Sequence, residues 1–320
     1  MNHARQKLTV LSYGGGQDSA ALLLLYVSDP SFRSRYADGE FIVVMSDTGD
    51  EHPHTKDWVI QTKKLCAVHK IPFFHLTKDQ GFHCESWPDL ISPQLRDEGG
   101  EFKPTLVQLG TKTCTLKLKL DPIYKFLDEF VNDRFGYGFD VSAKSRGCGK
   151  RAIKRFGQEN GRIRVLIGFA KGEEGRMEKS KRLEEKQHAA EEDSFWKHIE
   201  REFPLIDLSL DRVACQKLIA DHGFTVLPSN CMRCPYMSPE ELYWLHLNAP
   251  EKFDEWVRIE ERKLGRYAGS EKNHGVFNSK ETLTKKLEKV KAKYAHMSGE
   301  ALGAMLNDWK MNHGCGSGGY

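Results

Sequence analysis

The stretch that decides the fold is LTVLSYGGGQDSAALLLL, residues 8–25. An apolar run with β-branched residues leads into three consecutive glycines, a polar trio and a second apolar run, a pattern that predicts a strand, a tight loop and a helix. Successive glycines let the backbone approach a ligand closely, and the start of the following helix adds partial positive charge. The stretch therefore predicts a phosphate-binding loop at the first turn of an α/β sheet.

The residues of this loop exclude two familiar nucleotide loops. No Gly-Lys-Ser/Thr follows at Walker A spacing, and the glycines are contiguous rather than spread as G-x-G-x-x-G. The run Gly15-Gly16-Gln17-Asp18-Ser19 instead resembles the PP-loop, S-G-G-x-D-S, of the N-type ATP pyrophosphatases. Gly14 stands where that motif has serine, and Ser12 or backbone donors are the candidates to replace the missing hydroxyl. A glycine turn with a purely structural role is the alternative, although it would not require Asp18 and Ser19.

The composition bounds the classes of protein that the chain can belong to. It has 320 residues with a net charge of +3, enough for a sizeable core in one α/β domain with a helical appendage or in two domains. The small net charge means that a nucleic-acid contact would have to come from a local patch. We expect no membrane span and no secretory signal, and hence a cytoplasmic location. Eight cysteines in such a compartment favour metal ligands or reactive thiols over disulfides.

A second unit of the same kind follows the glycine loop. Residues 40–46 predict a buried strand that ends in Asp47-Thr48-Gly49, residues 55–69 a helix, and residues 71–76 another strand. This order predicts right-handed βαβ units in a parallel, doubly wound, Rossmann-like sheet with ligands at the carboxyl ends of its strands. Asp47, Thr48 and Gly49 would then lie beside the glycine loop. An ordinary Asx turn explains the same residues.

The rest of the chain divides into two predicted domains. A nucleotide-binding domain is expected over residues 1–237, with loop insertions near 78–113 and 134–164, and a helical region with a flexible glycine-rich tail over 238–320. Within the first domain we expect these further elements: a helix over 124–131, a buried strand over 165–170, an exposed helix or insertion over 178–192, a strand-like piece over 203–208 and a helix over 211–222.

Charged residues mark two more segments. Arg176 follows the strand predicted over 165–170, where its planar guanidinium suits phosphate or sulfate and a neighbouring glutamate would orient it. The basic, glycine-rich insertion near 134–164 is typical of a solvated face. A nucleic-acid contact is the alternative interpretation of that insertion.

Cysteine spacing indicates a metal site. Cys231-x-x-Cys234 followed by proline brings two thiolates within reach of one metal, with Cys114 as the third candidate ligand. The fourth candidate is Cys148, with Cys84 behind it. Zinc and an iron–sulfur cluster cannot be separated by spacing alone, and buried structural cysteines are the remaining alternative.

Taken in order, the motifs resemble those of a known family. They are the glycine loop of residues 14–19, Ser46-Asp47-Thr48-Gly49, Cys114-Thr115-x-Lys117 with Pro122-Ile123, Ile167-Gly168-Phe169 with Glu174 and Arg176, and Ser229-x-Cys231-x-x-Cys234-Pro235. The chain resembles the phosphoadenosine phosphosulfate (PAPS) reductase family within the N-type ATP pyrophosphatase superfamily. The resemblance implies an adenine nucleotide alpha hydrolase-like parallel sheet, an adenine nucleotide across the glycine loop, a 4Fe-4S cluster on Cys114, Cys231 and Cys234, and sulfur chemistry.

One mechanism in that family is sulfur transfer, as in enzymes of the DNA phosphorothioation type. ATP and Mg²⁺ would adenylylate an acceptor, for which a nucleic acid is one candidate, with loss of pyrophosphate, and sulfur from a donor would then displace AMP. By resemblance, phosphate would be bound by Gly14, Gly15, Gly16 and Ser19, and Asp18 and Asp47 would position the metal or nucleotide. The other residues that the resemblance places at the nucleotide or the reaction are Ser12, Gln17, Thr48, Gly49, Gly168, Glu174 and Arg176.

The other mechanism is reduction of PAPS or its dephospho form APS. Cys315, in the glycine-rich tail, would attack the sulfur, and a thioredoxin-like partner would resolve the product. The family's usual Glu-Cys-Gly-Leu/Ile-His tail is absent, since the chain reads His313-Gly314-Cys315-Gly316-Ser317. This departure favours sulfur transfer. A nucleotide-binding module without catalysis is a third alternative, because Gly14 replaces serine, and a homo-oligomer is an open expectation.

Overall fold

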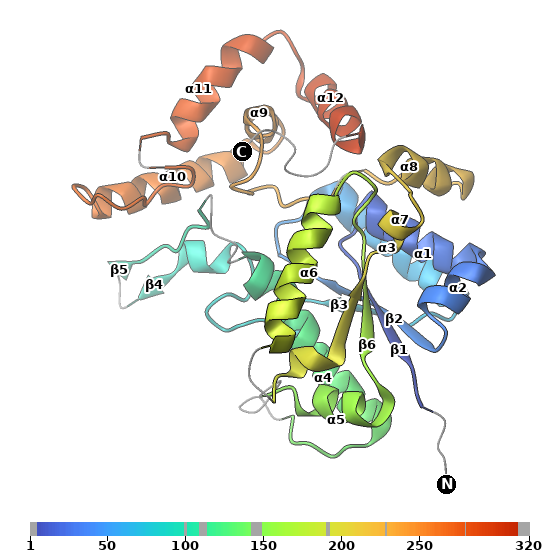
Figure 1. Ribbon diagram of the computed structural model, residues 1–320. Helices are drawn as coiled ribbons and strands as arrows, with labels where there is room; N and C mark the ends of the chain where they lie inside the picture. The colour runs from blue at the N-terminus through green and yellow to red at the C-terminus, as the bar shows by residue number, and fades with distance from the viewer. Residues whose placement is uncertain are drawn as a thin grey trace.

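Five parallel strands form the central sheet of the computed structural model, in the order β3-β2-β1-β6-β7 (Figure 1). Their bounds are β1 Leu8–Ser12, β2 Glu40–Ser46, β3 Phe73–Leu76, β6 Ile163–Ile167 and β7 Ile199–Glu202. The structure describes residues 5–98, 101–108, 114–141, 149–189, 193–227, 229–278 and 280–312. The expected α/β class with an all-parallel central sheet is confirmed, and 56% of the residues are helical.

The strand order creates a switch point beside β1. The chain runs outward from β1 through β2 to β3, then returns to the other side of β1 for β6 and β7. In the register, Ser12 at the end of β1 lies beside Val44 of β2 and Ile167 of β6. The carboxyl ends of β1 and β6 therefore meet at the switch point, which is where sheets of this kind bind their ligands.

Helices cover both faces of the sheet because the inner strands are apolar on both sides. Val10 and Leu11 are successive residues of β1, and each is fully buried in a different hydrophobic cluster. One face packs against α1 Gln17–Ser28, α2 Pro30–Tyr36, α3 Pro53–Val68, α7 Pro204–Asp207 and α8 Arg212–Asp221. The other packs against α4 Asp121–Phe135 and α5 Arg151–Asn160. This arrangement fixes the start of α1 at the switch point.

Helix α6, Glu174–Ala189, has no buried residue but covers the free edge of β7. The Glu184 carboxylate accepts a hydrogen bond from the main-chain N–H of Arg201 at 2.9 Å, and His188 Nε2 lies 3.2 Å from the carbonyl oxygen of Ile199. Side chains of a helix thus replace the neighbouring strand that β7 lacks. The exposed helix expected over 178–192 is present but begins four residues earlier.

Between β3 and α4 the chain forms a long irregular cover. It contains short helical turns at Lys78–Gln80 and Ser92–Leu95, the two-stranded hairpin of β4 Asp97–Glu98 and β5 Glu101–Phe102, and a π-helical stretch at Thr115–Leu120. The main-chain N–H of Leu90 donates to the carbonyl oxygen of Thr48 at 2.8 Å, which ties this cover to the loop after β2.

The last four described helices of the chain share a hydrophobic core of their own, above the sheet in Figure 1. They are α9 Pro239–Asn248, α10 Pro250–Arg266, α11 Leu283–Tyr294 and α12 Gly299–Asn312. Ser238 and Glu241 form a capping box at the start of α9. Trp256 and Leu302 are fully buried in this core, to which Met232 from the segment before α9 also contributes. Within the described residues no helix is long and apolar enough to span a membrane.

Several predicted boundaries were wrong. The strand expected over 165–170 is β6 at Ile163–Ile167, and the helix expected over 55–69 is α3, which begins at Pro53. The strand-like piece expected over 203–208 is instead the short helix α7, preceded by β7. Pro204 explains this difference, because it cannot donate to a sheet and its fixed φ suits the first position of a helix.

Candidate functional site

The glycine loop joins β1 to α1 at the switch point. Gly14 is exposed, and a Cβ placed on it would meet nothing within 4 Å. Gly16 is the N-cap of α1, and no side chain caps the helix there. The Ser19 hydroxyl donates to the Gly16 carbonyl at 3.0 Å and accepts from the Gly14 N–H at 3.3 Å. Ser19 therefore shapes the loop, and the uncapped helix start is suited to an anion.

Two of the predicted site glycines allow close contact between chain segments. A Cβ on Gly168, after β6, would lie 2.9 Å from the main-chain nitrogen of Ser19. A Cβ on Gly16 would lie 2.7 Å from the hydroxyl of Ser229, which precedes the Cys231-x-x-Cys234 motif. Gly15, the middle glycine of the loop, has φ +72°. Gly168 thus positions β6 against α1, and Gly16 admits the cysteine segment to the loop.

Four charged side chains from three parts of the chain meet beside the loop. An Arg212 guanidinium nitrogen lies 3.0 Å from Asp18 Oδ2 and 3.6 Å from Glu173 Oε1. Arg176 lies 2.6 Å from the same Glu173 oxygen and stacks on Phe169, with 4.2 Å from its guanidinium carbon to the ring centroid. The cluster has two positive and two negative groups, so a bound anion would change its charge balance.

Sequence reasoning placed Asp18 and Arg176 here, left open which neighbouring glutamate orients Arg176, and missed Arg212. Glu173 is the glutamate that orients Arg176. The carboxylate of Glu174, a residue predicted at the nucleotide, accepts from the Gly172 N–H at 3.0 Å and shapes the turn. Arg212 lies 194 residues from Asp18 in the chain and belongs to no motif. No spacing rule could select it. Gln17 is buried and contacts Gln216 of α8.

Burial raises the pKa of the Asp18 carboxyl from 3.8 to about 6, although Arg212 opposes this shift and Glu173 adds to it. Asp18 Oδ1 is buried and has no hydrogen-bond partner among the described residues, and the same holds for Arg212 Nε. The site therefore holds a carboxylate oxygen that is available to a cation or a proton donor.

This shift predicts a pH dependence of stability that Asp18→Asn removes. The folded protein binds a proton at Asp18 at higher pH than the unfolded chain, so this group lowers the free energy of unfolding as pH rises from about 4 to about 6. Relative to Asp18→Asn, the free energy of unfolding of the wild-type protein should fall by up to about 3 kcal/mol between about pH 4 and pH 7. Urea titrations of both proteins across this range measure the difference, and a relative gain with rising pH would contradict it.

The loop after β2 contributes a second group of predicted residues. Asp47 Oδ1 accepts from the Gly49 N–H at 2.8 Å in an Asx turn, and Oδ2 lies 3.7 Å from His75 Nε2. Gly49 has φ +82°, and a Cβ there would lie 2.6 Å from that of Asp89 in the irregular cover. This Asx turn therefore shapes the carboxyl end of β2, which is next to β1 in the sheet.

Cys231 joins the cysteine motif to this loop. Its sulfur lies 3.0 Å from the Thr48 hydroxyl, which donates to Glu51 Oε1 at 2.8 Å. Burial, with Glu51 nearby, raises the pKa of the Cys231 thiol well above its usual value. Cys114 and Cys231 both pack against one small hydrophobic cluster. The structure thus brings two of the predicted cysteines to the edge of the sheet where Thr48 lies.

The predicted metal site is not assembled by the described side chains. Among them, no three His, Cys, Asp or Glu residues are placed to hold one metal ion. The predicted ligand Cys148 and the predicted nucleophile Cys315 lie outside the described residues. An iron–sulfur or zinc site on Cys114, Cys148, Cys231 and Cys234 therefore stays a prediction.

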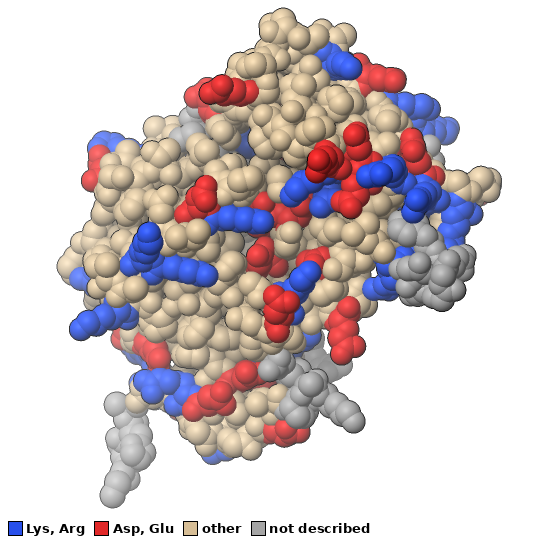
Figure 2. Space-filling model, turned by 180° about the vertical axis from the view of Figure 1, so that it is seen from behind, with Lys and Arg blue, Asp and Glu red and all other residues tan. Residues whose placement is uncertain are grey.

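Basic side chains of the 134–164 insertion are largely paired with carboxylates in its described part. Lys154 lies 2.5 Å from Asp193, and Arg155 lies 2.9 Å from Glu159. On the face shown in Figure 2, Lys and Arg are interspersed with Asp and Glu. This pairing is the arrangement expected of a solvated face, and the nucleic-acid contact stays a prediction.

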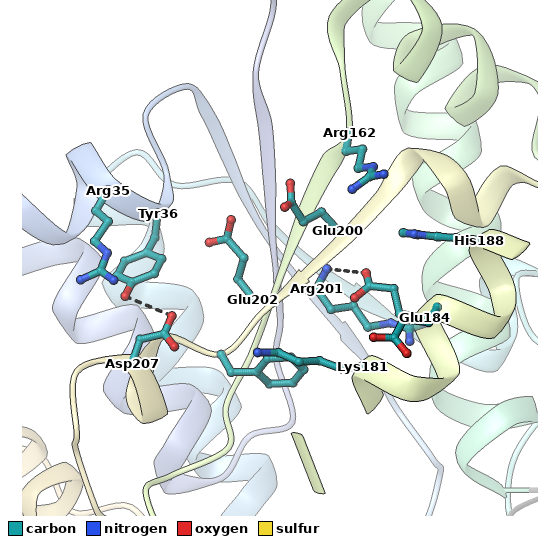
Figure 3. A pocket seen from close by; sticks show the side chains of 12 residues that line it. Arg35, Tyr36, Arg162, Lys181, Glu184, His188, Glu200, Arg201, Glu202 and Asp207 are labelled. Carbon is teal, nitrogen blue, oxygen red and sulfur yellow. Dashed lines mark hydrogen bonds between the residues drawn. The ribbon is translucent and has the colours of Figure 1, made fainter. Parts of the chain in front are cut away.

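A separate groove of about 550 Å³ runs beside β7 (Figure 3). Charges of both signs line it, including Glu200 and Glu202 of β7 and Lys181 of α6, and Tyr36 donates to Asp207 at 3.4 Å. The glycine loop does not contribute to its lining. We therefore place the candidate site at the loop rather than in this groove.

No family model, curated protein or solved structure matches the chain. The geometry at the switch point is therefore the basis for a functional assignment.

Proposed function

We propose that the chain is an ATP pyrophosphatase-type enzyme with an adenine nucleotide alpha hydrolase-like fold, which adenylylates an acceptor and transfers sulfur to it. The observation that carries the proposal is the uncapped start of α1 behind the exposed Gly14, at the switch point between β1 and β6. The positive end of a helix at this point suits the phosphates of a nucleotide.

The side chains around the loop have distinct roles in this proposal. Mg²⁺ fits Asp18, because Asp18 Oδ1 is buried without a hydrogen-bond partner among the described residues. The ion would neutralise phosphate charge. Arg176, about half exposed and oriented by Glu173, is available to the transferring group. Together these charges would stabilise negative charge that develops as pyrophosphate leaves.

Sulfur transfer is the chemistry we infer for the second step. The support is the position of the Cys231 sulfur 3.0 Å from Thr48, in the loop that follows the strand next to β1. We assign no step to an iron–sulfur cluster, because the described cysteines do not gather into a set of three ligands. In this proposal, surfaces outside the loop select the acceptor. A nucleic acid is one candidate.

A second candidate, PAPS or APS reduction with Cys315 as nucleophile, has one observation in its favour. Arg212, which contacts Asp18, also donates to the carbonyl oxygen of Lys310 at 3.4 Å, close to the end of α12. Cys315 follows Lys310 by five residues, so at most roughly 18 Å of extended chain separates them. Because Lys310 itself lies beside Arg212, this short separation keeps the thiol within reach of the site.

One assay separates these functions. With ATP and Mg²⁺, the wild-type protein should release pyrophosphate in the presence of its acceptor. Asp18→Asn should release it at least tenfold more slowly, because the variant weakens Mg²⁺ binding and the contacts that hold the loop. Cys315→Ser should keep this activity. Sulfite formation from PAPS or APS that Cys315→Ser abolishes would instead support the reductase. Tight ATP binding without pyrophosphate release or sulfur incorporation under any substrate would leave a non-catalytic nucleotide-binding module.

A further inference from the structure

One side chain, Arg212, connects the glycine loop to the end of the C-terminal helices. Arg212 is the first residue of α8, whose N-cap Asp211 accepts from the Ala214 N–H at 2.8 Å. One guanidinium nitrogen lies 3.0 Å from Asp18 Oδ2, and the other donates to the carbonyl oxygen of Lys310 in α12 at 3.4 Å. The side chain is only 13% exposed. Arg212 therefore contacts both the candidate site and the last turn of α12.

The contact with Lys310 acts as a cap on α12. The helix ends at Asn312, so the carbonyl of Lys310 is one of the last four, which have no donor within the helix. Arg212 supplies that donor from another helix. At 3.4 Å the hydrogen bond is long, and hydrogen bonds of this length are weak. A stronger acceptor near Arg212 would replace it.

The other contacts of Arg212 are incomplete. Its Nε and Asp18 Oδ1 are both buried without a hydrogen-bond partner among the described residues. Phosphate accepts two parallel hydrogen bonds from a guanidinium, and such charge-assisted bonds are stronger than a bond to a neutral carbonyl. A phosphate at the start of α1 would therefore compete well for this side chain.

We propose that Arg212 is a phosphate-binding residue that releases the Lys310 carbonyl when a nucleotide enters the glycine loop, so that occupancy of the site is transmitted to the last turn of α12. The inference rests on the proposed nucleotide site. It adds Arg212 to the residues of that site and adds a response of α12 to nucleotide binding. It holds whichever of the two reactions the site performs. The residues after α12, Cys315 among them, are attached to the turn that responds.

Amide hydrogen exchange tests the response, and equilibrium dialysis with ATP and Mg²⁺ tests the binding. In the wild-type protein, ATP should speed exchange in the last turn of α12, because a helix end without its cap opens more often. Arg212→Gln should show fast exchange there without ATP, no further change with ATP, and at least tenfold weaker ATP binding. Lys217→Gln, an exposed change on the same helix, should behave as wild type.

Two results would overturn this inference and leave the proposed function standing. One is that ATP binds the wild-type protein without changing amide exchange in α12. The other is that Arg212→Gln binds ATP as tightly as the wild-type protein does. Absence of ATP binding by the wild-type protein would overturn the proposed function, and the inference with it. Arg212→Lys keeps the positive charge beside Asp18 but lacks the planar guanidinium with its parallel N–H donors. It is therefore the control for a folding defect in Arg212→Gln. It should bind ATP with intermediate affinity and show fast exchange in α12.

Discussion

Replacing Arg233 with methionine is expected to lower the free energy of unfolding by about 3–5 kcal/mol. Arg233 lies between the two cysteines of the Cys231-x-x-Cys234 motif and is buried. Its side chain donates to both carboxylate oxygens of Asp50 at 3.1 Å and to Glu255 at 2.5 Å. Asp50 is 1% exposed, so the variant leaves a buried carboxylate whose partners among the described residues are the main-chain N–H of residue 233, at 3.0 Å, and Lys252, at 3.5 Å.

Urea unfolding measures this loss, and Lys217→Met is the matched control. Lys217 lies 2.8 Å from Asp221, but both side chains are more than half exposed, so breaking this pair should cost at most about 0.5 kcal/mol. A loss below about 1 kcal/mol for Arg233→Met would show that the buried pair does not stabilise the fold. The pair also holds the cysteine motif against the loop after β2, so we expect the variant to alter the environment of Cys231.

Gly168→Ala is expected to lower the free energy of unfolding by about 1–3 kcal/mol and to weaken nucleotide binding. The added Cβ would lie 2.9 Å from the main-chain nitrogen of Ser19 and 3.0 Å from the main-chain carbon of Asp18. Backbone atoms cannot rotate away as the end of a side chain does, so the start of α1 must move. Because that start is the proposed phosphate site, stability and binding should fall together.

Gly175→Ala separates this effect from a general effect of adding a methyl group. Gly175 is in α6, and its Cβ would meet nothing within 4 Å. Alanine is a better helix former than glycine, so this variant should be as stable as the wild type or more stable by up to about 1 kcal/mol. Unfolding and ATP-binding measurements on both variants test the comparison. Equal behaviour of Gly168→Ala and Gly175→Ala would show that the close approach is not required.

Local patterns predicted the elements that carry the site. Contiguous apolar runs predicted β1 and β2, and β6 with bounds shifted by two to three residues, because strands of a parallel sheet are buried on both faces and their sequences show it. Three glycines before an apolar run predicted the loop and the start of α1. β7 was missed because its sequence, IERE, is mostly charged. An edge strand covered by a polar helix does not require apolar residues on both faces.

The sequence by itself determined the parallel α/β sheet, the glycine loop at the end of its first strand, and the helices that follow the sheet, because each depends on residues that are adjacent or regularly spaced. The tertiary structure alone decided which charges surround the loop. It brought Arg212 to Asp18 across 194 residues, placed Glu173 beside Arg176 where the sequence left the choice of glutamate open, and paired Arg233 with Asp50. Contacts of this kind depend on how separate elements pack, and no local spacing in the chain records that packing.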